Sequence, residues 1–152
     1  MKLRISPVAP TDAPALLQLA QAVDEAHVYP TLSTAGQELL AQHRQQDIQQ
    51  LFEGEHLVAL KAEVNQRIVG YIAWREGHYI SHLYVANDFQ RQGIGTRLLD
   101  AMRRRATRFP LRLKASLNAV GFYQRYGFHP TAEIQNVGEI RFVPMSYRPW
   151  HY

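Results

Sequence analysis

Apolar residues recur along this chain with two different periods, one typical of helices and the other of strands. Residues 94–109 repeat an apolar side chain every three or four positions, which predicts an amphipathic helix. A first helix should begin near Asp12, which stands just before Pro14, and should end before Pro30. A second helix is expected over residues 34–52. These segments are the long helices of the predicted fold.

Runs rich in strand-forming residues occupy most of the remaining chain. Residues 56–64 and 67–76 flank Asn65-Gln66, which predicts a β-hairpin. Other strands are expected at residues 3–10, 79–85, 111–115, 132–137 and 139–147. A short helix should begin at Asn118 as its N-cap and stop at Gly127. This order predicts an α/β (α+β) fold with one mixed sheet of about seven strands and about four helices.

Length and composition set limits on this fold. A chain of 152 residues with 46% hydrophobic content can fill one core, so we expect a single domain over residues 1–152. No signal peptide follows Met1, and no apolar run is long enough to cross a membrane, so a soluble, cytoplasmic protein without membrane contact is expected. The lack of cysteine excludes disulfides and cysteine nucleophiles. Seven histidines form no HxxxH or HxH pair, so no metal is expected.

The positive charge of the chain is unevenly distributed. The formal net charge is +4 and the pI is near 9.6. Much of the excess lies between residues 91 and 114, at Arg91, Arg97, Arg103, Arg104, Arg105, Arg108, Arg112 and Lys114. Such a cluster favours an anionic partner.

The segment "QRQGIGT", residues 90–96, connects a predicted strand to a predicted helix. Glycines at a helix start let successive backbone amides point the same way, and the helix dipole adds positive potential, so the turn is suited to phosphate. It is not a dinucleotide fingerprint, because Leu98 replaces the third glycine of GxGxxG, and no GK[ST] follows as in a P-loop. The turn therefore requires another explanation.

Two segments together resemble a known family. "LYVANDFQRQGIGTRLL", residues 83–99, resembles the strand, Q/R-x-x-G-x-G/A turn and helix of the GCN5-related N-acetyltransferases (GNAT family). "NAVGFYQRYGF", residues 118–128, is similar to a second part of the same pattern, in the expected order. The resemblance covers nearly the whole chain, to about Tyr147. It implies an enzyme that transfers the acetyl group of acetyl-CoA to a primary amine of a small molecule or peptide, with CoA held in a split between residues 79–85 and 111–115.

The resemblance also implies roles for individual residues. Backbone groups of Leu83, Tyr84 and Val85 would pair with the pantetheine arm as an added strand does. The pyrophosphate would lie against residues 90–96. The full set implied for acetyl-CoA is Leu83, Tyr84, Val85, Gln90, Arg91, Gln92, Gly93, Ile94, Gly95, Thr96, Asn118, Phe122 and Arg125.

Catalysis by this family implies a proton donor and a route for the amine's proton. Tyr123 stands where relatives commonly carry the acid that protonates the leaving thiolate, although a tyrosine that only packs its helix would look the same. The base is less evident, because the region where many relatives carry a glutamate reads Tyr79-Ile80-Ser81-His82. We interpret His82 as a packed histidine rather than a base. Glu25 and His27, at the end of the first helix, and a water chain are the alternatives.

Two other functions fit the same sequence. A nucleic-acid-binding module would use the arginine cluster and the aromatic residues, although it leaves the glycines unexplained. A non-catalytic GNAT-like domain that only binds CoA is permitted by the missing glutamate. Salt-dependent binding to oligonucleotides would indicate the first, and acetyl-CoA binding without product would indicate the second.

The acceptor is not encoded in any motif. Residues 24–36 and 136–140 are expected to set acceptor choice, because such loops border the acceptor side in this family. The strand at 139–147 is apolar on both faces, which favours a homodimer formed by pairing of that strand with another chain.

Overall fold

The computed structural model describes residues 2–53 and 57–149. Its α-helices are α1 (Ala13–His27), α2 (Thr34–Gln50), α3 (Ile94–Arg105) and α4 (Val120–Tyr126). Its strands are β1 (Leu3–Pro7), β2 (Leu57–Val64), β3 (Arg67–Arg75), β4 (Tyr79–Val85), β5 (Leu111–Ser116), β6 (His129–Pro130), β7 (Gln135–Val137) and β8 (Ile140–Tyr147). Four single turns of 3-10 helix lie at Pro10–Asp12, Tyr29–Thr31, Asn87–Phe89 and Leu117–Ala119.

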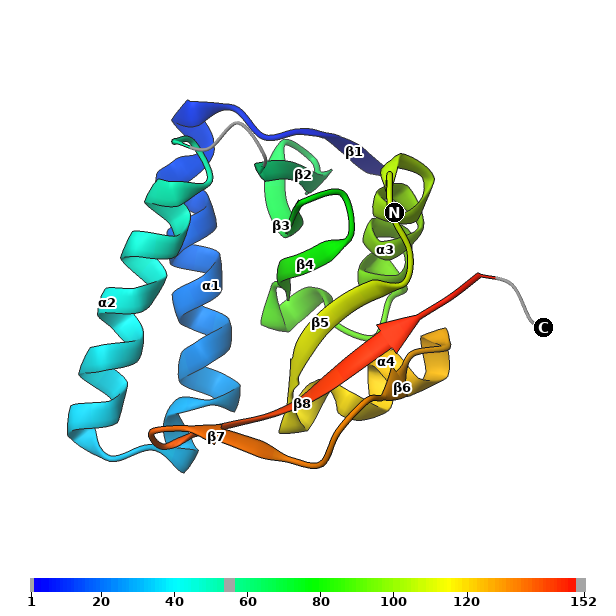
Figure 1. Ribbon diagram of the computed structural model, residues 1–152. Helices are drawn as coiled ribbons and strands as arrows, with labels where there is room; N and C mark the ends of the chain where they lie inside the picture. The colour runs from blue at the N-terminus through cyan, green and yellow to red at the C-terminus, as the bar shows by residue number, and fades with distance from the viewer. Residues whose placement is uncertain (1, 54–56, 150–152) are drawn as a thin grey trace.

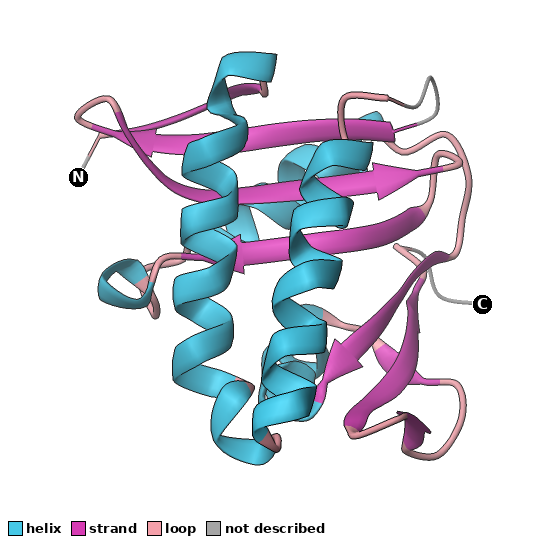
Figure 2. Cartoon of the chain, turned by 90° about the vertical axis from the view of Figure 1, so that its left-hand side faces the viewer, coloured by secondary structure: helices cyan, strands magenta, loops and turns pink. Residues whose placement is uncertain are grey.

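The strands form one mixed sheet in the order β1-β2-β3-β4-β5-β8-β6, with β7 also paired to β8. All neighbours are antiparallel except β4 and β5, which are parallel and share only the register pair Tyr79 and Arg112. Beyond this pair the two strands diverge, and Figure 2 shows β5 and β8 turning away from the flat part of the sheet. The sheet is therefore continuous within β1–β4 and within β5–β8, and it is split between them.

The helices cover both faces of the sheet. Figure 1 shows α1 and α2 side by side on one face, with α3 and α4 on the other. The apolar side of α3 is buried against β2, β3 and β4 through Ile94, Leu98, Leu99 and Met102. Close approach is possible because β3 carries Gly70, where a Cβ would lie 3.2 Å from the Leu98 side chain. The predicted amphipathic helix thus covers one face of β3.

The predicted hairpin between β2 and β3 is confirmed. Asn65 and Gln66 both have positive φ, 50° and 67°, as a two-residue turn between twisted antiparallel strands requires. Strand β4 also has the predicted bounds, and its pairing with β3 contains a bulge. Ala73 pairs with His82 and Trp74 with Ile80, so Ser81 is the extra residue. The bulge lies where β4 begins to separate from β5.

Several predicted boundaries are wrong. The third helix ends at Arg105, not at residue 109, because Pro110 disfavours helix at Phe109 and the Thr107 N–H bonds to the Gly77 carbonyl at 3.0 Å. The strand predicted at 3–10 ends at Pro7, since Pro10 begins a 3-10 turn. The second helix ends at Gln50 rather than at residue 52. His56, the first residue of the predicted strand 56–64, lies outside the described residues.

The segment after α4 also differs from the prediction. The strand expected at residues 132–137 is only Gln135–Val137, and a further strand pair, His129–Pro130, precedes it. The Thr131 N–H bonds to the Pro144 carbonyl at 2.8 Å, which bends the chain between the two. Strand β8 is not an edge, because β5 pairs with one side of it and β6 and β7 pair with the other. The prediction that this strand could pair with another chain to form a homodimer is therefore wrong. Whether the protein forms a dimer in another way stays untested.

None of the helices within residues 2–53 and 57–149 is long and apolar enough to cross a membrane.

Candidate functional site

The split between β4 and β5 opens into a cavity of about 810 Å³. Its lining comes from both faces of the sheet, with α1 and α2 on one side and α3, α4 and the turn at 90–96 on the other. The lining includes all but one of the residues implied by the family pattern: Leu83, Tyr84, Val85, Gln90, Arg91, Gly93, Ile94, Gly95, Thr96, Asn118, Phe122, Tyr123 and Arg125. The exception is Gln92, which is exposed and does not line the cavity.

The turn at 90–96 takes a backbone form that depends on glycine at one position. Gly93 is the residue before α3 and has φ 82°, in the left-handed region, and Arg91 also has positive φ, 63°. A Cβ at Gly93 would meet no heavy atom within 4 Å, so this position is constrained by its φ rather than by space. The turn leads directly into α3, whose first-turn N–H groups have no partner within the helix. These donors lie at the cavity wall.

The second glycine of the turn is required for packing instead. A Cβ at Gly95 would lie 3.0 Å from Cζ of the Phe122 ring. The ring of Phe122 therefore lies directly against the first turn of α3 and joins it to α4. On the next turn of α4, the Arg125 guanidinium lies over Gly121, 3.3 Å from where a Cβ would be. The two segments of the family pattern thus meet at one end of the cavity.

The backbone of β4 faces the split at its C-terminal end. Leu83, Tyr84 and Val85 pair with β3 on one side, and no register pair joins them to β5 on the other. The side chain of Gln90 turns back and donates from Nε2 to the Val85 carbonyl at 3.1 Å. Residues 83 and 84 keep a free strand edge that an extended ligand could continue.

Tyr123 lies in α4, 8% exposed, between two other rings. Its ring centroid is 5.2 Å from that of Phe122 and 5.5 Å from that of Phe128, both edge-on. Within the described part of the chain its hydroxyl has no hydrogen-bond partner, and the residue lines the cavity. Burial raises the pKa of Tyr123 above its usual value, so the hydroxyl keeps its proton at neutral pH.

The prediction that Asn118 caps this helix is wrong. Residues Leu117–Ala119 form a 3-10 turn, and the α-helix begins at Val120 with Ala119 as its N-cap. Asn118 lies inside the 3-10 turn that follows the extended Ser116, and its exposed side chain lines the cavity. Gly127 is confirmed as the C-terminal stop, with φ 123°.

The opposite side of the cavity contains a buried ion pair that the sequence analysis did not identify. Asp24 of α1 is 2% exposed and accepts a hydrogen bond from Arg44 Nε of α2 at 2.7 Å. Arg44 also bonds to Asp47 at 3.2 Å, and its guanidinium lies 5.4 Å from the Tyr84 ring centroid. Burial raises the pKa of Asp24 above its usual value, and Arg44 offsets part of that rise. Asp24 and Arg44 both line the cavity.

His82 belongs to the same side of the sheet. It is 7% exposed, and its Nδ1 lies 3.1 Å from the hydroxyl of Tyr71, which is fully buried. Burial lowers the pKa of His82 to about 4, so the ring is neutral at physiological pH. The interpretation of His82 as a packed, hydrogen-bonded residue is confirmed, although it also forms part of the cavity wall.

Of the two residues considered for the base at the end of the first helix, Glu25 is exposed and does not line the cavity, whereas its neighbour Asp24 does. His27 lines the cavity as well, and its Nε2 lies 3.2 Å from Asn87 Oδ1.

The spacing of buried residues along α1 and α2 could have predicted the Asp24–Arg44 ion pair. Asp24 continues the buried stripe of Leu16 and Ala20 at four-residue steps, and Arg44 stands midway between the buried Leu40 and Ile48. Two opposite charges on the core-facing stripes of two successive helices indicate a buried ion pair.

The described residues include no group of three or more histidines, aspartates or glutamates arranged to hold a metal ion.

Comparison with known proteins agrees with this geometry. Residues 20–149 match the family model of the acetyltransferase (GNAT) domain. Over 94 residues the chain is 32% identical to the uncharacterized N-acetyltransferase YafP of Escherichia coli K12, a match that spans 59% of this chain and 60% of that protein. The GCN5-related N-acetyltransferase structure from Rhodopseudomonas palustris is similar with a TM-score of 0.84 at 22% identity, covering 97% of this chain and 96% of that chain.

A second solved structure has the same arrangement of strands and helices. PaiA N-acetyltransferase from Thermoplasma acidophilum, solved in complex with coenzyme A, is similar with a TM-score of 0.74 at 18% identity, covering 97% of this chain and all of that chain (100%). These likenesses confirm the predicted fold. Because the family model covers most of the chain, the protein belongs to the GNAT family of acetyltransferases.

Proposed function

We propose that this protein transfers the acetyl group of acetyl-CoA to a primary amine of a small molecule or peptide. The observation that carries the proposal is the continuous cavity through the split sheet, which joins the glycine turn of α3 to Tyr123 and reaches the far face at Asp24 and His82. Because the lining comes from both faces of the sheet, acetyl-CoA and the amine would approach one another from opposite sides. Its volume of about 810 Å³ is within the range of ligand and cofactor sites.

The residues on the α3 and α4 side fit the chemistry of CoA. The first-turn amides of α3 and the Arg91 side chain would hold the pyrophosphate, since a helix start favours anions. The free edge of β4 at Leu83 and Tyr84 would bond to the amide groups of the pantetheine arm. Asn118 and Arg125 would contact the pantetheine and the adenosine end. When bound, acetyl-CoA supplies a thioester, an activated form of the acetyl group.

Tyr123 would act as the acid. As the amine nitrogen bonds to the acetyl carbon and the carbon–sulfur bond breaks, the tyrosine hydroxyl would donate its proton to the sulfur and regain one from water. Tyr123 carries the proton for this step at neutral pH, since the usual pKa of tyrosine is about 10 and burial raises it further. Strand β4 carries no carboxylate, so we propose that the amine loses its proton to water in the part of the cavity bounded by the neutral His82.

The first test is direct. Purified protein is incubated with acetyl-CoA and a panel of primary amines, and the release of free thiol is followed. Amine-dependent release is expected. Binding of acetyl-CoA without transfer to any amine would support the non-catalytic alternative, and steeply salt-dependent binding to oligonucleotides would support a nucleic-acid-binding role for the arginine cluster.

The second test concerns the turn. Gly93→Val forces a β-branched residue to φ 82°, and Gly95→Val pushes against the Phe122 ring. Both changes should lower calorimetric acetyl-CoA affinity by at least about tenfold, since each displaces donor groups by more than a hydrogen bond tolerates. Gly138→Val is the matched control, because Gly138 also has positive φ and open space around it but lies in the β7–β8 turn. Unchanged affinity in both turn variants would contradict the assignment of this turn.

A further inference from the structure

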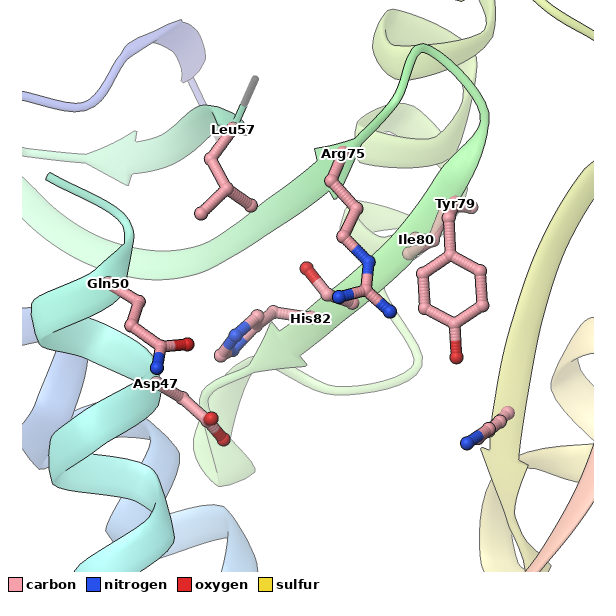
Figure 3. A pocket seen from close by; sticks show the side chains of 9 residues that line it. Asp47, Gln50, Leu57, Arg75, Tyr79, Ile80 and His82 are labelled. Carbon is pink, nitrogen blue, oxygen red and sulfur yellow. The ribbon is translucent and has the colours of Figure 1, made fainter. Parts of the chain in front are cut away.

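A second, smaller cavity lies beside the first, on the α2 face of the split. It has a volume of about 400 Å³ and is bounded by the C-terminal end of α2, the β3–β4 hairpin and β5. In Figure 3, Asp47 and Gln50 approach it from α2, Arg75 and Tyr79 from the hairpin, and His82 from between them. Both cavities share Ile80, Ser81, His82 and Lys114. The smaller cavity is therefore an extension of the larger one, away from the glycine turn.

Two cations of this extension have no carboxylate partner among residues 2–53 and 57–149. The Arg75 guanidinium carbon lies 4.6 Å from the Tyr79 ring centroid, and Lys114 Nζ lies 5.0 Å from that of Phe142. Contact with a ring face restrains a cation, and Arg75 also makes a hydrogen bond to the Tyr79 side chain, but a guanidinium and an ammonium each carry several N–H donors, so further donors remain. Neither cation takes part in an ion pair in the described structure. Both donor groups are therefore available to a ligand.

The negative charge of the extension is smaller than its positive charge. Asp47 is the carboxylate in the described part of the lining, and it shares the Arg44 guanidinium with Asp24, at 3.2 Å and 2.7 Å, so these three groups together carry a single net negative charge. His82 contributes no charge at neutral pH, because burial lowers its pKa to about 4. Within the described lining, the two positive charges of Arg75 and Lys114 therefore exceed the single net negative charge of the Asp24, Arg44 and Asp47 group. A ligand with a second ammonium group would be repelled there, and one with an oxyanion would be attracted.

From this charge distribution, and resting on the acetyltransferase function proposed above, we infer that the acceptor is a small primary amine that carries a carboxylate. Arg75 holds the carboxylate, since a guanidinium matches its two oxygens, and Lys114 adds a second positive charge. The amine then lies toward His82 and the larger cavity, where it meets the thioester. A volume of about 400 Å³ suits a compound of amino-acid size.

The inference is tested with amines of equal length that differ only in charge. One set is β-alanine, propylamine and diaminopropane, and a longer set is γ-aminobutyrate, butylamine and diaminobutane. Initial rates with saturating acetyl-CoA give kcat and KM for each. The amino carboxylates should have kcat/KM values several-fold to about tenfold above those of the matching diamines, because Arg75 and Lys114 are exposed and solvent screens part of their attraction and repulsion.

Variants locate the preference. Arg75→Gln should raise KM for the better amino carboxylate by roughly 3- to 10-fold and reduce its advantage over the uncharged amine, with a smaller change for Lys114→Gln. Arg104→Gln is the control, because Arg104 is exposed on α3, on the other face of the sheet. Melting temperatures should be equal in all three.

The outcomes separate this inference from the function on which it rests. Equal or better use of the diamines, or an unchanged preference in Arg75→Gln, would overturn the inference and leave the acetyltransferase proposal standing. No transfer to any of these amines and none to the wider panel would overturn both. A fall in acetyl-CoA affinity in Arg75→Gln would assign Arg75 to the co-substrate and would overturn its acceptor role.

Discussion

The two sides of the split sheet are built from different kinds of interaction. On the side of α3 and α4, here named the turn side, the cavity wall depends on backbone groups of residues 83–85 and 90–96 and on the rings of Phe122 and Tyr123. On the side of α1 and α2, here named the charge side, it depends on the side chains of Asp24, Arg44 and His82.

This difference has a physical basis. A helix start provides several N–H donors along a few consecutive residues, so anion binding can be encoded locally. A buried carboxylate needs a cation brought to it by folding, and Asp24 and Arg44 are separated by a turn between two helices. The turn side should therefore respond to substitution mainly in binding and turnover, and the charge side mainly in stability and pH dependence.

The largest effect is expected on the turn side, at Tyr123. Tyr123→Phe keeps the ring between Phe122 and Phe128 and removes the proton, so turnover should fall by roughly 10²- to 10⁴-fold. Acetyl-CoA affinity and melting temperature should hardly change. Steady-state kinetics with an accepted amine measure the loss. Near-normal turnover in a stable variant would assign the acid role to water or to another residue.

Tyr126 gives the matched control for that experiment. Its hydroxyl donates to Asp100 at 2.7 Å, and it does not line the cavity. Tyr126→Phe should cost about 1 kcal/mol of stability and leave turnover nearly intact.

The next largest effect is expected on the charge side. Arg44→Met leaves the carboxylate of Asp24, 2% exposed, without its cation, so the free energy of unfolding should fall by about 3–5 kcal/mol. Adding Asp24→Asn to Arg44→Met should recover part of this loss. Urea unfolding of the native protein, the single variant and the double variant would measure the three free energies of unfolding. Arg67→Met is the control, because the pair of Arg67 with Asp88 is 57% and 60% exposed and should contribute almost nothing. Equal losses of unfolding free energy in Arg44→Met and Arg67→Met would contradict the expectation that the buried pair contributes more to stability than the surface pair.

A smaller effect on the charge side depends on pH. His82 has a pKa of about 4 in the folded protein and near 6.5 when unfolded, so the unfolded state binds a proton first as pH falls. Its contribution to stability is complete above about pH 6.5 and is lost as pH falls through about 4, on the order of 3 kcal/mol in total. His82→Gln should remove this part of the acid sensitivity in unfolding curves recorded across that range. His129→Gln, at an exposed position, should leave the full sensitivity in place.

The smallest effect is expected at the contact between the β7–β8 hairpin and the start of α2. Glu139, before β8, accepts hydrogen bonds from the Ser33 N–H at 3.0 Å and its hydroxyl at 2.7 Å, and so ties the hairpin to the start of α2. These bonds lower the pKa of the Glu139 carboxyl below its usual value. Glu139→Ala should accelerate amide exchange in the β7–β8 hairpin roughly several-fold without changing global stability. Exchange rates equal to those of native protein would show that these bonds do not restrain the hairpin.

Much of the fold followed from the sequence because its signals are local. The β2–β3 turn, the bounds of β4 and the start of α3 were predicted from turn residues and periodicity. The end of α3 was not predicted correctly. Ala106 and Phe109 continue the apolar spacing of the helix and pack on the core, although the backbone is already extended at Ala106. Apolar spacing reports burial, and burial does not require that the chain still be helical.

The sequence by itself determined the family, the glycine turn and the position of Tyr123, because each is carried by a few consecutive residues with a fixed local geometry. The tertiary structure alone decided that β4 and β5 separate after one pair, and that Asp24 rather than Glu25 meets Arg44. It also decided that Arg75 and Lys114 line the same cavity with no carboxylate partner among the described residues. Pairing of distant charges depends on how helices and strands dock, and docking is set by the whole core, so no short segment of sequence could show it.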